Sequence, residues 1–178
     1  MRTKIRDQLY GVGAVSRGKV ALIIIGPPAS GKSSLATPLA TKHNALIIDS
    51  DMAKPWLPEY EAGIYASAVH QESAQIASMV FEKAIDVGDN VVYVAVGKSL
   101  PNLRELVSLL KELDYKVELH LVDADPEVCA DRAVKRLHSE GRFVDPAYVL
   151  YEVGTRPRNN LEILLDENCC DEFEKHTN

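Results

Sequence analysis

The sequence predicts an α/β fold: a parallel sheet of about five strands, with helices on both faces and a small arginine-bearing lid. Three observations predict it. Apolar, β-branched runs such as residues 20–25 are typical of strands that are buried on both faces. Amphipathic helical segments alternate with these runs. A glycine-containing turn joins the first run to the first helix, so the ligand site is expected where the strands end.

The expected elements alternate along the chain and end with two helices and a strand. Strands are expected over residues 20–25, 45–48, 91–96 and 117–122 and around Phe173. Helices are expected over residues 31–43, from Val69 to Gly88, from Pro101 to Leu113, from Asp125 to Gly141, from Asp145 onward and over residues 160–165. Pro38 lacks a backbone donor, so it is expected to bend or shorten the first helix. Residues 52–66 contain prolines and a glycine, which predict a loop or a broken helix.

Periodicity and end signals justify the helices. After Val69, apolar residues recur at helical spacing, at Ile76, Val80, Ala84 and Val87. Leucines repeat the pattern at Leu103, Leu106, Leu110 and Leu113. Asp125 with Pro126 is typical of a helix start, because a carboxylate caps the first turn and proline fits it.

Length and composition fit one domain, residues 1–178, with residues 1–19 as an N-terminal extension and about 132–146 as the lid region. The net charge of −6 gives no general attraction to nucleic acid or to an anionic membrane. Three cysteines indicate no disulfide framework, and no apolar run has the length of a signal peptide or a membrane span. A cytoplasmic protein without a membrane partner is therefore expected.

Residues 26–33, GPPASGKS, fit the phosphate-loop pattern GxxxxGK[ST] at every fixed position. Backbone N–H groups in such a loop, at the start of a helix, attract phosphate oxygens. Lys32 would neutralise charge on the β- and γ-phosphates of ATP, and Ser33 would bind Mg²⁺. The fold class is therefore that of the phosphate-loop NTPases and kinases. The expected nucleotide-binding residues of the loop are Gly26, Ala29, Ser30, Gly31, Lys32, Ser33 and Ser34.

A kinase is the favoured member of this class. The guanine-binding segment Asn-Lys-x-Asp of switch GTPases does not occur, and the chain is short for a motor ATPase. A kinase needs a base near the acceptor hydroxyl and positive charge over the transferred phosphoryl group. Asp51 and the arginines between residues 132 and 142 fit these needs.

Asp49 and Asp51 follow the second strand, which we expect to lie beside the phosphate loop. A carboxylate there can take the proton of the acceptor and can hold Mg²⁺ through water. We assign the base to Asp51 and the metal to Ser33, with Asp49 or Asp51 contributing through water. The alternative for Asp49 is a cap on the next turn.

Several stretches in one order resemble the zeta toxin family of phosphate-loop kinases, from about Val20 to Leu165. The stretches are GPPASGKSSL, IIDSDMAKPWLPEY, AVHQESAQIA, the Gly-Asp-Asn-Val-Val entry to a strand, RLHSEGRFVDPAYV and NNLEIL. The resemblance implies that Lys32 and Ser33 hold nucleotide and metal and that Asp51 is the base. It also implies that Arg136 and Arg142 are lid arginines on the ATP phosphates, and a toxin role would require an antitoxin protein as partner.

One departure from the family pattern leaves the acceptor open. The family continues the third strand into an acidic residue followed by Gly-Thr, whereas this chain has Val94 and Val96. In members that phosphorylate nucleotide sugars, those side chains help to hold the acceptor. The acceptor here is then a nucleotide sugar or a similar small molecule, or alternatively a nucleic acid end, a modified base or a nucleoside. A further alternative is a nucleotide-binding module without phosphotransfer.

The same departure removes a Walker B carboxylate, which would help to hold the metal. Asp123 or Asp125 is a possible replacement, and capping is the other role of Asp125.

The remaining polar and aromatic residues have two interpretations each. They serve the site or the packing of the fold, and they are His70, Glu72, Ser73, Trp56, Tyr60, Tyr65, Arg156 and Arg158. Cys169 and Cys170 have no second ligand pair nearby in the sequence, so no zinc site is expected there.

Overall fold

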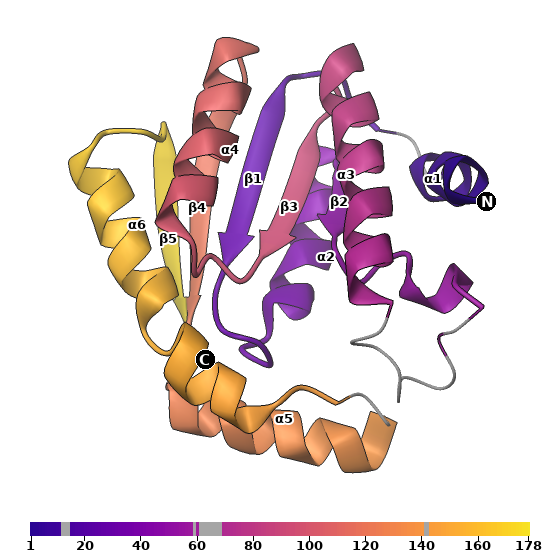
Figure 1. The fold of residues 1–178 in the computed structure, drawn as a ribbon. Coiled ribbons are helices and arrows are strands. Elements are labelled where there is room, and N and C mark those ends of the chain that lie inside the picture. Colours follow the sequence, from indigo (N-terminus) through magenta and orange to yellow (C-terminus); the bar gives the residue numbers. More distant parts are fainter. Residues whose placement is uncertain (12–14, 59, 61–68, 141–142) are drawn as a thin grey trace.

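The computed structural model describes residues 1–11, 15–58, 60, 69–140 and 143–178. Five parallel strands form one sheet in the order β2-β3-β1-β4-β5 (Figure 1). The strands are β1 (Val20–Ile25), β2 (Leu46–Asp49), β3 (Val91–Ala95), β4 (Lys116–Asp123) and β5 (Glu172–Thr177). The predicted parallel α/β sheet is therefore confirmed.

Helices cover both faces of this sheet. They are α1 (Arg2–Tyr10), α2 (Lys32–His43), α3 (His70–Val87), α4 (Leu100–Glu112), α5 (Pro126–Glu140) and α6 (Arg156–Asp166). Helix α2 lies behind β1 and β3 in Figure 1, whereas α3, α4 and α6 lie in front of the sheet. Two short helices complete the described chain: the 3₁₀-helix η1 (Lys54–Trp56) and the π-helix η2 (Tyr148–Val153).

The alternation of β1 side chains between two cores explains the layers. Ile23 and Ile25 point into the larger core, which contains residues of α3, α4 and α6. Leu22 and Ile24 point to the opposite face and contact the core that includes α2. All four side chains are fully buried, as expected for a central parallel strand.

Three features differ from the sequence expectations. The N-terminal residues include helix α1, whose Ile5 is buried against a cluster with Val69 and Ile76. Helix α2 is not shortened, since it continues through Pro38 to His43. Strand β2 does not lie beside β1, because β3 is inserted between them. Hydrophobic pattern alone does not give strand order, so this last expectation was wrong.

All five strands end at the same side of the sheet, which we call its C-terminal edge. The arrowheads in Figure 1 point to this edge, and helix α5 crosses the molecule beneath it. The apolar face of α5 packs on η2 and on Ala29, which lies in the turn after β1. Residues from the first half of the chain and from α5 therefore come together at one edge.

Candidate functional site

The phosphate loop, residues 26–33, leaves β1 at Ile25 and enters α2 at Lys32. Two glycines are required by its shape. A Cβ atom on Gly26 would lie 2.6 Å from the backbone oxygen of Val122 on β4. Gly31 has φ +99°, and a Cβ atom there would lie 2.5 Å from Nδ2 of Asn178. Both glycines therefore allow the chain to turn tightly between the strand and the helix.

The loop has the chemistry needed for a polyphosphate. No side chain caps the start of α2, where backbone N–H groups and the helix dipole favour an anion. Lys32 Nζ donates to the backbone oxygens of Gly26, at 2.9 Å, and Pro27, at 2.7 Å, so its ammonium is held over the loop. Ser30 is fully buried inside the turn. These groups fit the phosphates of a nucleotide, and the Ser33 hydroxyl at the start of α2 fits a magnesium ligand.

Asp49 is the last residue of β2, at the C-terminal edge of the sheet. It is paired in register with Val94 of β3, which is paired in turn with Ile24 of β1. Val94 therefore brings an apolar side chain to the strand between Asp49 and the phosphate loop. Asp49 Oδ1 accepts a hydrogen bond of 2.8 Å from the backbone N–H of Asp51, so the turn-capping role is present. Its carboxylate also has the chemistry to hold a magnesium-bound water.

Asp51 is the centre of a cluster that also contains Lys54 and His70, hereafter the Asp51 cluster. Lys54 Nζ lies 2.7 Å from Asp51 Oδ1, and His70 Nδ1 lies 3.7 Å from the same oxygen. Three segments supply these residues: the turn after β2, η1 and the start of α3. Lys54 is 7% exposed, which is rare for a lysine unless it is paired.

Burial lowers the pKa of both basic residues of the Asp51 cluster. It lowers the pKa of Lys54, while the charges of Tyr60 and Asp49 oppose this shift. Burial also lowers the pKa of His70, helped by the charge of Lys54 and opposed by Asp49. His70 is therefore neutral at pH 7, and Lys54 is the cation that faces the Asp51 carboxylate. Lys54 was not predicted from the sequence; the nearest signal is that a lysine stands three residues after the second Asp of the Asp-x-Asp pair.

The start of α3 fixes the turn that carries Asp51. Ser73 Oγ donates a 2.5 Å hydrogen bond to the backbone oxygen of Ser50. Glu72 accepts a hydrogen bond of 2.8 Å from Arg2 Nε, which ties α3 to α1. Ser73 and Glu72 therefore have structural partners, whereas His70 faces Asp51.

The aromatic residues with two interpretations in the sequence follow β2 in the chain. Trp56 is half-exposed, and Tyr60 packs beside a buried cluster at α1 and α3. Tyr65 lies outside the described residues.

Helix α5 brings basic residues towards the phosphate loop. Burial raises the pKa of the Cys129 thiol, and the positive charges of Arg132 and Lys32 oppose this shift. Arg132 comes three residues after Cys129 on α5, the helix that packs on Ala29 of the loop. Arg136 follows one turn later on the same helix. Arg142 lies outside the described residues. Arg132 is one of the arginines between residues 132 and 142 that the sequence predicted for the lid.

The carboxylates after β4 have partners of their own. Asp125 caps α5: its Oδ1 accepts from the Glu127 N–H at 2.7 Å, and its backbone oxygen accepts from the Cys129 N–H. Asp123 Oδ1 accepts from Arg158 Nε and Nη2 at 2.9 and 2.6 Å, and its Oδ2 lies 2.7 Å from Lys175 Nζ. Burial alone would raise the pKa of Asp123, but the hydrogen bonds from Arg158 and Lys175 outweigh it and hold that pKa below its ordinary value. Arg158 is therefore a partner of this carboxylate.

The family of the chain is decided by a match to a family model. The model of the zeta toxin family matches residues 11–162. The chain belongs to the zeta toxin family. This match covers the phosphate loop, the Asp51 cluster and the whole of helix α5. No curated protein matches this zeta toxin homologue in a direct comparison.

Solved structures share the fold of this zeta toxin homologue at low sequence identity. The PezAT toxin–antitoxin system of Streptococcus pneumoniae gives a TM-score of 0.78 at 16% identity, over 99% of this chain and 74% of that one. The AvrRxo1-ORF1:-ORF2 complex with ATP gives 0.76 at 16%, over 99% and 62%. A putative kinase from Chloroflexus aurantiacus J-10-fl gives 0.65 at 14%, over 94% and 87%. The fold is therefore that of the phosphate-loop kinases.

None of the helices in the described part of the chain combines the length and the apolar character that a membrane span requires.

Proposed function

We propose that this protein transfers the γ-phosphoryl group of ATP, with Mg²⁺, to a hydroxyl group of a small molecule. One observation carries the proposal: a phosphate loop with its lysine and a carboxylate held by a buried lysine occur at the same edge of one parallel sheet. In an in-line phosphoryl transfer, a phosphate loop binds the donor nucleotide and a carboxylate accepts the proton of the acceptor hydroxyl.

On the donor side, the N–H groups at the start of α2 and the Lys32 ammonium bind the β- and γ-phosphates. The Ser33 hydroxyl and, through water, the Asp49 carboxylate would hold Mg²⁺. The ion would neutralise the negative charge that develops on the phosphates during transfer. In the current arrangement Lys32 donates to loop carbonyls, so nucleotide binding exchanges these hydrogen bonds for contacts with phosphate.

On the acceptor side, Asp51 is the general base. The acceptor oxygen attacks the γ-phosphorus, its proton passes to the Asp51 carboxylate, and the bond to the β-phosphate oxygen breaks to release ADP. Lys54 keeps the carboxylate ionised and oriented, and neutral His70 lies beside the same carboxylate oxygen. Lys54 and His70 are therefore positioning residues in this proposal.

Arginines of α5 and of the segment after it stabilise the transferred phosphoryl group. Arg132 and Arg136 are one turn apart on α5, and Arg142 follows the helix. Cations that approach the γ-phosphate as charge moves to the leaving oxygen act mainly in the transition state. Residues 132–146 act as the lid in this proposal, and the Arg136→Ala variant should lose more in turnover than in ATP affinity.

The acceptor class is a small hydroxyl compound such as a nucleotide sugar. Val94, which is paired with Asp49, stands where the family pattern has an acid, so a different set of contacts would select the substrate. The net charge of −6 favours a small molecule over a nucleic acid. An antitoxin is the proposed protein partner, because the PezAT neighbour is a toxin–antitoxin system.

The deciding experiment incubates the protein with ATP and Mg²⁺ and with a panel of nucleotide sugars, nucleosides and oligonucleotides, followed by mass spectrometry. The proposal expects one panel member to gain a single phosphoryl group. Lys32→Ala is the inactive control, and Lys42→Ala is its match, because Lys42 is an exposed residue at the other end of α2. ATP binding without a phosphorylated product from any class would favour a nucleotide-binding module instead.

A further inference from the structure

Two histidines and a glutamate meet on strands β4 and β5, away from the Asp51 cluster. His120 of β4 is paired in register with Glu174 of β5, and Val122 with His176. Residues paired in parallel strands point to the same face, so His120, Glu174 and His176 share one face. Val122, which is paired with His176 on this face, belongs to the core that includes α2. The three side chains are therefore on the α2 face of the sheet and not on the face covered by α4 and α6.

The three side chains place one ligand atom each around a common point. His120 Nδ1 lies 3.2 Å from His176 Nε2, and Glu174 Oε2 lies 3.8 and 3.7 Å from these two nitrogens. A triangle with these sides has a point about 2.1 Å from all three corners, which is the range of zinc–nitrogen and zinc–oxygen bonds. The three ligand atoms therefore lie close enough together to share one ion.

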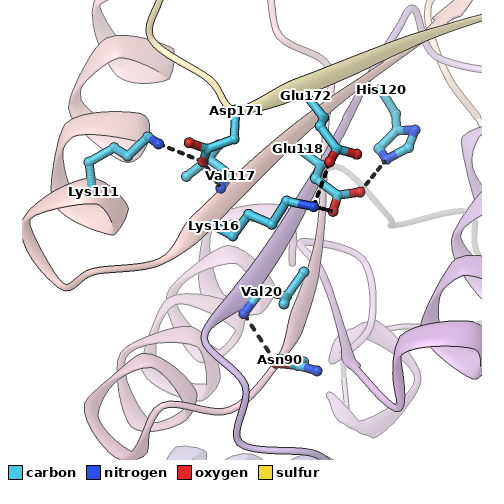
Figure 2. Close-up of polar contacts among 9 residues, drawn as sticks. All are labelled: Val20, Asn90, Lys111, Lys116, Val117, Glu118, His120, Asp171 and Glu172. Carbon is cyan, nitrogen blue, oxygen red and sulfur yellow. Dashed lines mark hydrogen bonds and ion pairs between the residues drawn. The ribbon is translucent and has the colours of Figure 1, made fainter.

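His120 is prepared to be a ligand through Nδ1. It is only 4% exposed, and its Nε2 has no hydrogen-bond partner among the described residues. The nearest carboxylate is that of Glu118, with Oε2 at 3.9 Å from Nε2; Figure 2 shows this contact and the Lys116 ammonium that holds Glu118. A proton on Nε2, the nitrogen nearer to Glu118, would leave the lone pair on Nδ1.

The charge state of His120 also suits a ligand. Burial lowers the pKa of His120, and the neighbouring His176 lowers it further. The imidazole is therefore neutral at pH 7, the form that binds metals. Without a metal, one imidazole donates a hydrogen bond to the other across the 3.2 Å contact. A metal ion would replace the proton of this hydrogen bond. The imidazole that donated it would then carry its proton on its other ring nitrogen.

We propose that His120, Glu174 and His176 bind a divalent ion of the zinc class. Two imidazoles and one carboxylate favour zinc over magnesium, which prefers an all-oxygen set. Glu174 is largely exposed, so the ion can enter from solvent and keep a water molecule as its fourth ligand. This site is separate from the magnesium ligands of the proposed kinase centre.

The ion would fasten the outermost strand of the sheet beside the phosphate loop. Asn178 follows β5, two residues after His176, and its Nδ2 donates to the Ser30 backbone oxygen at 2.7 Å. The Asn178 N–H also donates to the backbone oxygen of Asp123. A clamp between β4 and β5 would therefore hold Asn178 against the loop.

The test is calorimetric titration of the chelator-treated full chain with zinc chloride, without nucleotide. A Cys169→Ser, Cys170→Ser background removes competing thiols. We expect one ion per chain with micromolar or tighter affinity, weakened at least about tenfold by His176→Gln or Glu174→Gln. Glu172→Gln is the matched control, since Glu172 lies two residues from Glu174 on the same face, and it should bind like the parent.

His120→Gln changes a buried side chain, so its result counts only if circular dichroism shows a folded protein. His176→Gln and Glu174→Gln change residues of the outermost strand β5, so they are not expected to unfold the protein. Binding that is absent at millimolar zinc, or equal in the parent and in His176→Gln and Glu174→Gln, would overturn the proposal. If the parent protein binds zinc but phosphorylates no acceptor, the proposed function would be overturned and the zinc site would remain supported.

Discussion

The phosphate loop and the Asp51 cluster lie at the same edge of the sheet but are built in different ways. The loop uses backbone groups of a short continuous segment, and the side chain it depends on is Lys32. The Asp51 cluster uses only side chains, and its three members come from the turn after β2, from η1 and from α3. The loop therefore depends on the absence of side chains at Gly26 and Gly31, whereas the Asp51 cluster depends on the side chains of all its members.

The largest effect is expected for Lys32→Ala, because Lys32 is the charged side chain of a loop that otherwise binds phosphate through its backbone. The variant removes the ammonium where phosphate charge concentrates, so we expect phosphotransfer to fall by about three to five powers of ten. Turnover with saturating acceptor and ATP affinity are the measurements. Lys42→Ala should behave as the parent. Parent-like turnover in Lys32→Ala would remove the donor role from the loop.

Asp51→Asn tests the side-chain cluster at its centre. The amide keeps the size of the carboxylate but cannot accept the acceptor proton, so we expect phosphotransfer to fall by about two to four powers of ten with ATP and Mg²⁺ binding retained. Asp86→Asn, at an exposed position of α3, is the matched control. A collapse of Mg²⁺ binding would make Asp51 a metal ligand, and unchanged activity would move the base to Asp49.

Lys54→Met separates positioning from chemistry, because methionine fills a similar volume in the buried site. Without the ammonium, the Asp51 carboxylate is less well oriented and easier to protonate. We expect turnover to fall about 10- to 100-fold, and the acidic limb of its pH profile to move to higher pH. Lys4→Met, at an exposed position of α1, controls for the loss of one charge. A fall in turnover with an unmoved pH profile would make Lys54 a purely structural residue.

The sequence predicted the donor side better than the acceptor side for a physical reason. Hydrophobic runs and the glycine pattern are local, so the strands, the phosphate loop and the position of α2 followed from residues close together in the chain. Strand order, the insertion of β3 between β1 and β2, and the contact of His70 with Asp51 depend on contacts between distant segments. Helix α1 was missed because its sequence, RTKIRDQLY, has few apolar residues, and Ile5 is the one that is buried.

The smallest effect is expected at Asp123, a carboxylate that ends β4 as Asp49 ends β2 but is occupied by cations. Its bonds with Arg158 and Lys175 lower its pKa in the folded state, so the stabilisation is present above the ordinary pKa of about 3.8 and is lost as the pH falls below it.

Asp123→Asn should therefore lower the free energy of unfolding by about 1–2 kcal/mol at pH 7 and flatten its decline below about pH 4. Urea unfolding at pH 7, 5 and 3 measures both effects, with Asp114→Asn, at a highly exposed residue, as control. Phosphotransfer should change less than about threefold, since Asp123 is held by Arg158 and Lys175 and not by substrate. A loss as large as that of Asp51→Asn, at unchanged stability, would instead place Asp123 among the metal ligands and end the distinction between the occupied carboxylate and the catalytic one.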